Sequence, residues 1–168
     1  MTGLDGHRVY LDWNATAPLR PEARAAMLAA MDAVGNPSSV HAEGRAAKKI
    51  VETARRQVAR LVGCDPSGVV FSSGATEAAN TVITGSWLRI VSSEIEHDCV
   101  RDPVAGSSAS AIDLPVPRDG VFPATDWLRE FMPEKSQTLL CIQAANSETG
   151  VEQNSYIPAG IARDTGNA

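Results

Sequence analysis

The stretch VVFSSGATEAANTVITGSWLRIVS, residues 69–92, contains the pattern that decides the fold. Residues 69–72 form a short apolar run, residues 75–84 have helical spacing, and residues 88–92 form a second apolar run. Short apolar runs separated by a helical segment are typical of parallel strands whose sheet is covered on both faces. We therefore predict a strand, a helix and a second strand here.

The same alternation continues towards the C-terminus and gives way to helices towards the N-terminus. Further strands are expected over residues 111–116 and 138–142, and further helices over residues 123–131 and 157–163. Upstream, a helix is expected from Pro21 to Val34, stopped by Gly35, and a longer one over residues 41–62, stopped by Gly63. The predicted fold class is α/β, with a mostly parallel sheet flanked by helices.

Composition narrows the range of functions. The chain has 168 residues, of which 43% are hydrophobic and 21% charged, so it can bury a core. Its net charge of -5 argues against nucleic acid as a partner, since phosphate binding needs a basic surface. No apolar run is long enough to cross a membrane, and the first residues lack a signal-peptide pattern. We expect a cytoplasmic protein without a membrane partner.

Metal and disulfide chemistry are not indicated. The three cysteines, Cys64, Cys99 and Cys141, lack CxxC spacing, and no two histidines stand at metal-ligand spacing. No metal site is therefore expected.

The first polar feature is the turn between the strand at 69–72 and the following helix. Free N–H groups at a helix N-terminus, a threonine hydroxyl and Gly74, which allows close approach, make a site suited to a bound anion. The alternative is an ordinary turn capped by Ser72 or Ser73. The spacing is not that of a nucleotide-binding P-loop.

Two further polar features follow predicted strands. His97 comes after the strand at 88–92, and Asn146 after the strand at 138–142. Ligands bind at such strand ends in parallel sheets. The alternatives are a structural histidine and a turn asparagine that caps its own backbone. Together, an anion cradle, an imidazole and an amide suggest a phosphorylated planar cofactor.

Five motifs in this order resemble the cysteine desulfurases, pyridoxal-phosphate (PLP) enzymes of the class-V aminotransferase superfamily. They are residues 10–18 (YLDWNATAP), 35–45 (GNPSSVHAEGR), 71–80 (FSSGATEAAN), 95–97 (IEH) and 146–153 (NSETGVEQ). The resemblance implies the large domain of PLP-dependent fold type I. Residues 1–34 would belong to the small domain or arm, and residues 35–168 to the first part of the large domain.

The resemblance also implies roles for individual residues. Ala75 and Thr76 would bind the phosphate of PLP, and Asn146 would hydrogen-bond the phenolic oxygen of its ring. His97 would stack on the ring and act as a catalytic residue in proton transfer. The implied reaction converts L-cysteine to L-alanine and passes sulfur, as an enzyme persulfide, to an acceptor protein for iron–sulfur cluster or thio-cofactor assembly. Such enzymes are homodimers.

The chain departs from the family pattern in several places. Trp13 and Ser147 stand where many members have asparagine. The Asp that pairs with the ring nitrogen, the Schiff-base Lys and the nucleophilic Cys lie, in the family, downstream of the segment at 146–153. We therefore expect the isolated chain to be inactive. The resemblance also implies that the strand at 69–72 lacks its neighbours in this chain, so that a second polypeptide, a swapped partner or a rearranged structure would have to fill the gap in the sheet.

Other functions remain open at this stage. A selenocysteine lyase, an aminotransferase or an epimerase of the same superfamily would share these motifs. A non-catalytic remnant that acts only by pairing with a partner is the alternative outside enzymes.

Overall fold

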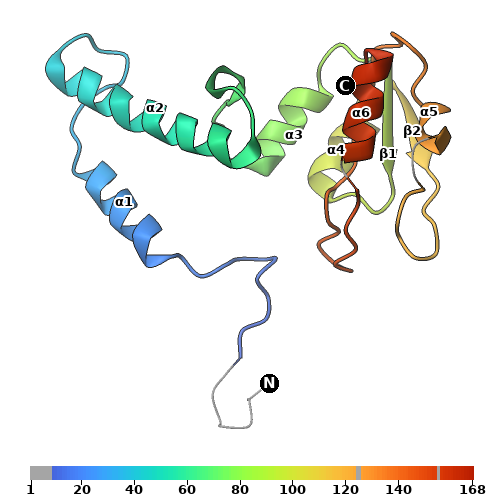
Figure 1. Ribbon diagram of the computed structural model, residues 1–168, viewed down its shortest axis with the longest axis horizontal. Coiled ribbons are helices and arrows are strands. Elements are labelled where there is room, and N and C mark those ends of the chain that lie inside the picture. The colour runs from blue at the N-terminus through green and yellow to red at the C-terminus, as the bar shows by residue number, and fades with distance from the viewer. Residues whose placement is uncertain (1–8, 124–125, 155) are drawn as a thin grey trace. The chain divides into compact units, whose positions relative to one another are not determined.

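The computed structural model describes residues 9–123, 126–154 and 156–168. The chain divides into two compact units, which meet in sequence between Phe71 and Ser72. We call them the N-terminal and the C-terminal unit and describe each by itself (Figure 1). The predicted boundary between the small domain or arm and the large domain, at residues 34 and 35, is a different division of the chain. It stays a prediction.

The N-terminal unit consists of α1 (Pro21–Met31), α2 (Ala42–Val62) and a short 3-10 helix, η1 (Pro66–Gly68). Both predicted helices are present, although α1 ends at Met31 with Asp32 as its C-cap, short of the predicted Val34 and Gly35. The side chain of His41 caps α2, because its Nδ1 accepts a hydrogen bond from Gly44 N at 3.3 Å. Gly63 ends α2 in the left-handed conformation, with φ of 71°, which glycine adopts without strain.

Residues 69–72, predicted as a strand, are not one. This segment pairs with no strand within the described residues, and Val70 is 86% exposed. The apolar run has the composition of a buried strand, but a strand exists only when a neighbour accepts its backbone hydrogen bonds. The segment was predicted to lack its neighbouring strands, and without them it does not form a strand.

The C-terminal unit is built on a sheet of three parallel strands in the order β2-β1-β3. The strands are β1 (Arg89–Ser93), β2 (Ser110–Leu114) and β3 (Thr138–Leu140); the helices are α3 (Ala75–Ile83), α4 (Asp98–Ala105), α5 (Asp126–Arg129) and α6 (Tyr156–Thr165). The parallel α/β class predicted from the sequence is confirmed, and Figure 1 shows the strands with their helices.

Two apolar cores lie on opposite faces of the central strand β1. Ile90 points to one face and packs with Ile83 of α3 and Val104 of α4. Its neighbour Val91 points to the other face and packs with Leu128 and with Ile161 of α6. Alternation along a strand sends adjacent side chains to opposite faces, so α3 and α4 cover one face and α5 and α6 cover the other.

Three local features differ from the expectations. Helix α4, which contains Pro103, was not among the predicted elements. Helix α5 is shorter than the predicted 123–131, of which residues 124 and 125 lie outside the described residues. Strands β2 and β3 each end two residues early, before the predicted 116 and 142. No helix in the described ranges is both long and apolar enough to span a membrane.

The outer edge of β3 carries one further backbone pairing. The N–H of Ala168 donates to Thr138 O at 3.1 Å, and the N–H of Leu140 donates to Ala168 O at 2.7 Å. Ala168 thereby occupies the position that a residue of a fourth strand would take.

Candidate cofactor site

His97 stands at the junction between the turn after β1 and helix α4. It is the N-cap residue of α4, and its Nδ1 accepts a hydrogen bond from Cys99 N at 3.0 Å. An accepting Nδ1 places the proton of the neutral imidazole on Nε2. The ring is otherwise exposed. The structure thus gives His97 the structural role considered as an alternative, and leaves Nε2–H for a ligand.

Asn146 lies in the loop after β3 and is only 8% exposed. Its Oδ1 accepts hydrogen bonds from Glu148 N at 2.9 Å, Thr149 N at 2.8 Å and Thr149 Oγ1 at 3.1 Å. Its Nδ2 donates to Ile95 O at 3.1 Å. The alternative of an asparagine that caps its own turn is confirmed. Because the amide nitrogen carries two hydrogens, one of them remains for a ligand, and that contact stays a prediction.

The turn before His97 and the loop that carries Asn146 are held together directly. Ile95 O accepts from Asn146 Nδ2 and also from Gln143 Nε2, the latter at 3.1 Å. The N–H of Gln143 donates to Glu96 Oε1 at 2.7 Å. The structure therefore brings His97 and Asn146 to one end of the sheet, as parallel strands require.

Glu96 and Cys141 are the two groups here with perturbed acidity. Burial raises the pKa of the Glu96 carboxyl, and the hydrogen bond from Gln143 partly offsets this. Burial also raises the pKa of the Cys141 thiol to about 11, with a further contribution from the negative charge of Glu96. The Cys141 thiol is therefore protonated at neutral pH, as expected for a packing residue.

The predicted phosphate site lies at the N-terminus of α3. Gly74 precedes the helix with extended backbone, and a Cβ there would meet no atom within 4 Å. The carboxylate of Glu77 folds back and accepts from Ser73 N at 2.6 Å, and hydrogen bonds from Ser73 lower its pKa. Ala75 and Thr76 form the first turn and are exposed. Within the described residues no hydrogen bond joins them to His97 or Asn146.

Comparison with known proteins places the chain in a family. The family model for class-V aminotransferases matches residues 9–164. The chain belongs to the class-V aminotransferases. This family is PLP-dependent, which agrees with the resemblance drawn from the five motifs.

Two relatives show which branches of the family are similar to this chain. The selenocysteine lyase of Bos taurus is 36% identical, over 88% of this chain and 40% of the lyase. The IscS-like cysteine desulfurase of Mycobacterium tuberculosis is 35% identical, over 84% of this chain and 39% of the desulfurase. The chain thus spans about 40% of the length of these relatives.

Solved structures agree with this placement. The NifS-like protein from Rickettsia africae superposes with a TM-score of 0.83 at 29% identity, over 96% of this chain and 46% of that one. DndA from Streptomyces lividans gives a TM-score of 0.75 at 30% identity, over 95% of this chain. The α/β fold is therefore that of the NifS-like class-V aminotransferases.

The residues present fit a PLP molecule in their chemistry. The first turn of α3 provides N–H donors and the Thr76 hydroxyl for a phosphate, and the space beside Gly74 is open. His97 offers an exposed aromatic ring with a free Nε2–H, and Asn146 offers one amide hydrogen. These donors suit a dianion and a planar ring.

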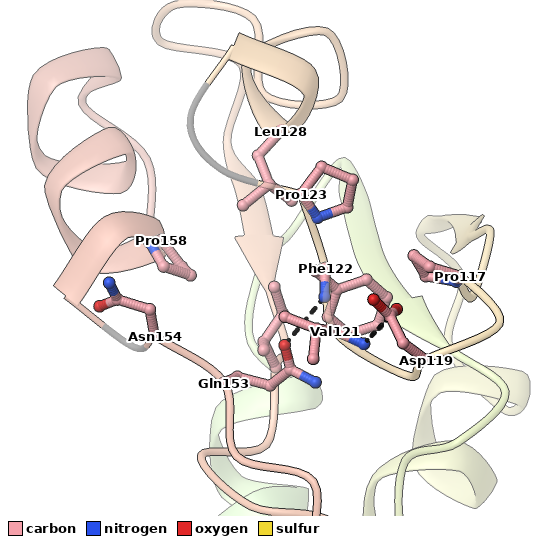
Figure 2. A pocket seen from close by; sticks show the side chains of 10 residues that line it. Pro117, Asp119, Val121, Phe122, Pro123, Leu128, Gln153, Asn154 and Pro158 are labelled. Carbon is pink, nitrogen blue, oxygen red and sulfur yellow. Dashed lines mark hydrogen bonds between the residues drawn. The ribbon is translucent and has the colours of Figure 1, made fainter.

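A separate cavity of about 480 Å³ lies on the α5 and α6 face of the same unit. Figure 2 shows Gln153 beside it, with its Oε1 accepting from Phe122 N at 3.0 Å. The Nε2 of Gln153 donates to Gly120 O at 2.6 Å, so this amide is used in joining two loops. The described lining includes none of the four predicted site residues, and the cavity belongs to the packing between loops.

Glu96 and Gln143 are the residues that sequence reasoning missed. Both adjoin predicted features, since Glu96 precedes His97 and Gln143 follows the apolar run of β3. A charged residue is expected to be exposed when only the sequence is known, and the burial of Glu96 becomes evident only from the fold. The signals in the sequence were this adjacency and, for Glu96, its place in the motif at 95–97.

Proposed function

We propose that this chain is the N-terminal, cofactor-binding portion of a PLP-dependent cysteine desulfurase. The observation that carries the proposal is the joining of the His97 turn to the Asn146 loop through Ile95 and Glu96. It supports one site built from two segments that are far apart in sequence. Identity of about 35% to the IscS-like desulfurase supports the choice of branch.

Each proposed role uses a group that the structure leaves available. The first turn of α3, at Ala75 and Thr76, would bind the phosphate through N–H groups and a hydroxyl. His97 would lie against the pyridine ring and hold or move a proton at Nε2. Asn146 would donate its remaining amide hydrogen to the phenolic oxygen. When bound, PLP supplies the electron sink for chemistry at the substrate α-carbon.

The substrate and sulfur acceptor are proposed for the whole enzyme. L-cysteine would be converted to L-alanine, with sulfur carried as a persulfide to an acceptor protein. A selenocysteine lyase is the second candidate, because the relative from Bos taurus is as similar as the desulfurases. Comparing L-cysteine with L-selenocysteine as substrates of the whole enzyme separates the two.

We also propose that the outer edge of β3 pairs with a strand of a second copy of this chain. The Ala168 pairing supports it in showing that this edge accepts a parallel backbone, and a strand of a second copy would take the place of Ala168 there. Cavities of about 210 Å³ and 310 Å³ adjoin the same edge, and both are lined by Leu140 and Ile142. A strand with apolar side chains would fill them and satisfy the remaining backbone groups.

Cofactor binding by the purified 168-residue chain is the direct test. Equilibrium dialysis against PLP and against pyridoxal, which lacks the phosphate, should show binding of PLP alone. Replacing Thr76 by alanine should weaken PLP binding about tenfold to a hundredfold, the loss of about one hydrogen bond to a charged group. Thr81→Ala is the matched control, since Thr81 lies on the same helix and donates to Glu77 O at 2.8 Å. Equal binding of PLP and pyridoxal would contradict the proposed phosphate site.

A further inference from the structure

Glu96 is a buried carboxylate in a position where burial is costly. Glu96 is 7% exposed and lies at the end of the turn that follows β1. The backbone N–H of Glu96 closes that turn by donating to Ser93 O at 3.2 Å. A charge taken out of water destabilises the fold unless it is hydrogen-bonded, so the contacts of this carboxylate need an explanation.

The carboxylate reaches across to the neighbouring strand. Oε1 accepts from Gln143 N at 2.7 Å, which joins residues 47 positions apart in sequence. Gln143 is three residues before Asn146, and Glu96 is directly before His97. A single charge-assisted hydrogen bond therefore connects the backbones that carry the two predicted cofactor contacts.

Two hydrogen bonds to Ile95, the residue before Glu96, join the same two segments. Ile95 O accepts from the side-chain amides of both Gln143 and Asn146, each at 3.1 Å. These two bonds are neutral, whereas the bond to Glu96 is charge-assisted and is the shortest of the three. Of the three bonds, that to Glu96 thus contributes most to the alignment.

Burial raises the pKa of Glu96, and the hydrogen bond from Gln143 N is the contact that favours its ionised form. It lines the cavity of about 310 Å³ between α3, α4 and β3, where the other described lining groups are apolar except for the Cys141 thiol and Gln143. The Cys141 thiol stays protonated near neutral pH, as its raised pKa of about 11 indicates. His97 is the adjacent titratable residue in the chain, and its Nδ1 is bonded to Cys99 N.

We infer that Glu96 is a positioning residue, which sets the Asn146 loop against the His97 turn through its hydrogen bond to Gln143 N. The inference deepens the proposed function and rests on it for its consequence, because the alignment matters only if His97 and Asn146 contact the cofactor. The positioning itself can be measured without cofactor.

The test uses the isotope-labelled 168-residue chain and three variants. Glu96→Ala removes the acceptor, Glu96→Gln keeps an acceptor oxygen without a titratable charge, and Glu94→Gln changes an exposed carboxyl two residues away as the control. Nuclear magnetic resonance follows the Gln143 backbone amide, the Asn146 side-chain amide and the His97 ring. Dialysis gives the PLP affinity of each variant.

We expect hydrogen exchange of the Gln143 amide to accelerate about tenfold in Glu96→Ala, with shifted Asn146 and His97 resonances. Glu96→Gln should restore slow exchange. In the unmodified chain the Gln143 amide shift should titrate with Glu96, at a midpoint above that of an ordinary glutamate, and this titration should vanish in Glu96→Gln. Glu94→Gln should retain both properties.

The possible outcomes separate the inference from the proposed function. Unchanged Gln143 exchange and unmoved Asn146 and His97 resonances in Glu96→Ala would overturn the inference. If these signals move as expected while the unmodified chain binds no PLP, the positioning role stands and the proposed cofactor site fails. If PLP binds, its affinity should fall about tenfold in Glu96→Ala and recover in Glu96→Gln.

Discussion

At the scale of single residues, the site depends on polar groups that already have structural partners. His97 caps a helix through Nδ1, and Asn146 closes a turn through Oδ1. Each keeps one hydrogen for a ligand, so the same contacts that fix the side chain also fix the direction of its free donor. A structural and a functional role are therefore compatible at both positions.

The cysteines differ in a way that labelling can measure. The pKa of Cys141, raised to about 11, leaves about one thiolate in a thousand at pH 8, and its side chain is half-buried. Cys64 is exposed after α2 and serves as the internal control. Iodoacetamide followed by peptide mass spectrometry should show Cys64 modified first and Cys141 at least tenfold more slowly. Comparable rates would contradict the burial of Cys141.

At the scale of elements, glycines decide how α2 begins and ends. Gly44 lies in the first turn of α2, where a Cβ would come within 2.4 Å of Ser39 O. Gly63 follows the last turn with a positive φ, but nothing lies within 4 Å of its Cβ position. The first glycine is needed for close approach of two backbones, and the second for its conformation alone.

This difference predicts that alanine lowers the free energy of unfolding by different amounts at Gly44 and at Gly63. Gly44→Ala forces the 35–41 loop away from the helix and should lower the free energy of unfolding by about 1–3 kcal/mol. Gly63→Ala adds only left-handed strain and should cost about 1 kcal/mol. Urea unfolding followed by circular dichroism at the helical band measures both. A larger loss for Gly63→Ala would show that the contact with Ser39 is relieved at little cost.

At the scale of the whole molecule, the sheet has an incomplete edge. β1 is covered on both sides by β2 and β3 and on both faces by helices, whereas β3 has only Ala168 on its outer side. The apolar run at 69–72 is also without a neighbouring strand in the described chain. Both features leave a segment of strand-forming composition without a neighbouring strand on one side in the described chain.

The proposed pairing at this edge predicts association. Light scattering of the purified chain should give twice the mass of one copy. Leu140→Glu places a charge beside both edge cavities and should weaken the association about tenfold or more. The control Leu88→Glu changes a leucine that is already exposed, and circular dichroism verifies that both variants fold. A single-copy mass for the unmodified chain would contradict pairing with a second copy.

The sequence by itself determined the family, the parallel α/β class and most of the elements. Local patterns decide these, since the helices at 42–62 and 75–83 have their apolar spacing within their own residues and a glycine signal directly beside them, Gly63 after the first and Gly74 before the second. The ordered motifs likewise indicated His97 and Asn146 without any knowledge of their contacts.

Only the tertiary structure decided what depends on neighbours. The segment 69–72 is no strand because no neighbouring strand accepts its hydrogen bonds, although its composition favours one. Glu96 is buried because the loop after β3 folds over it, and its partner Gln143 lies 47 residues away. Burial and strand pairing are relations between distant segments, and a local pattern of residues contains no information on which segments meet.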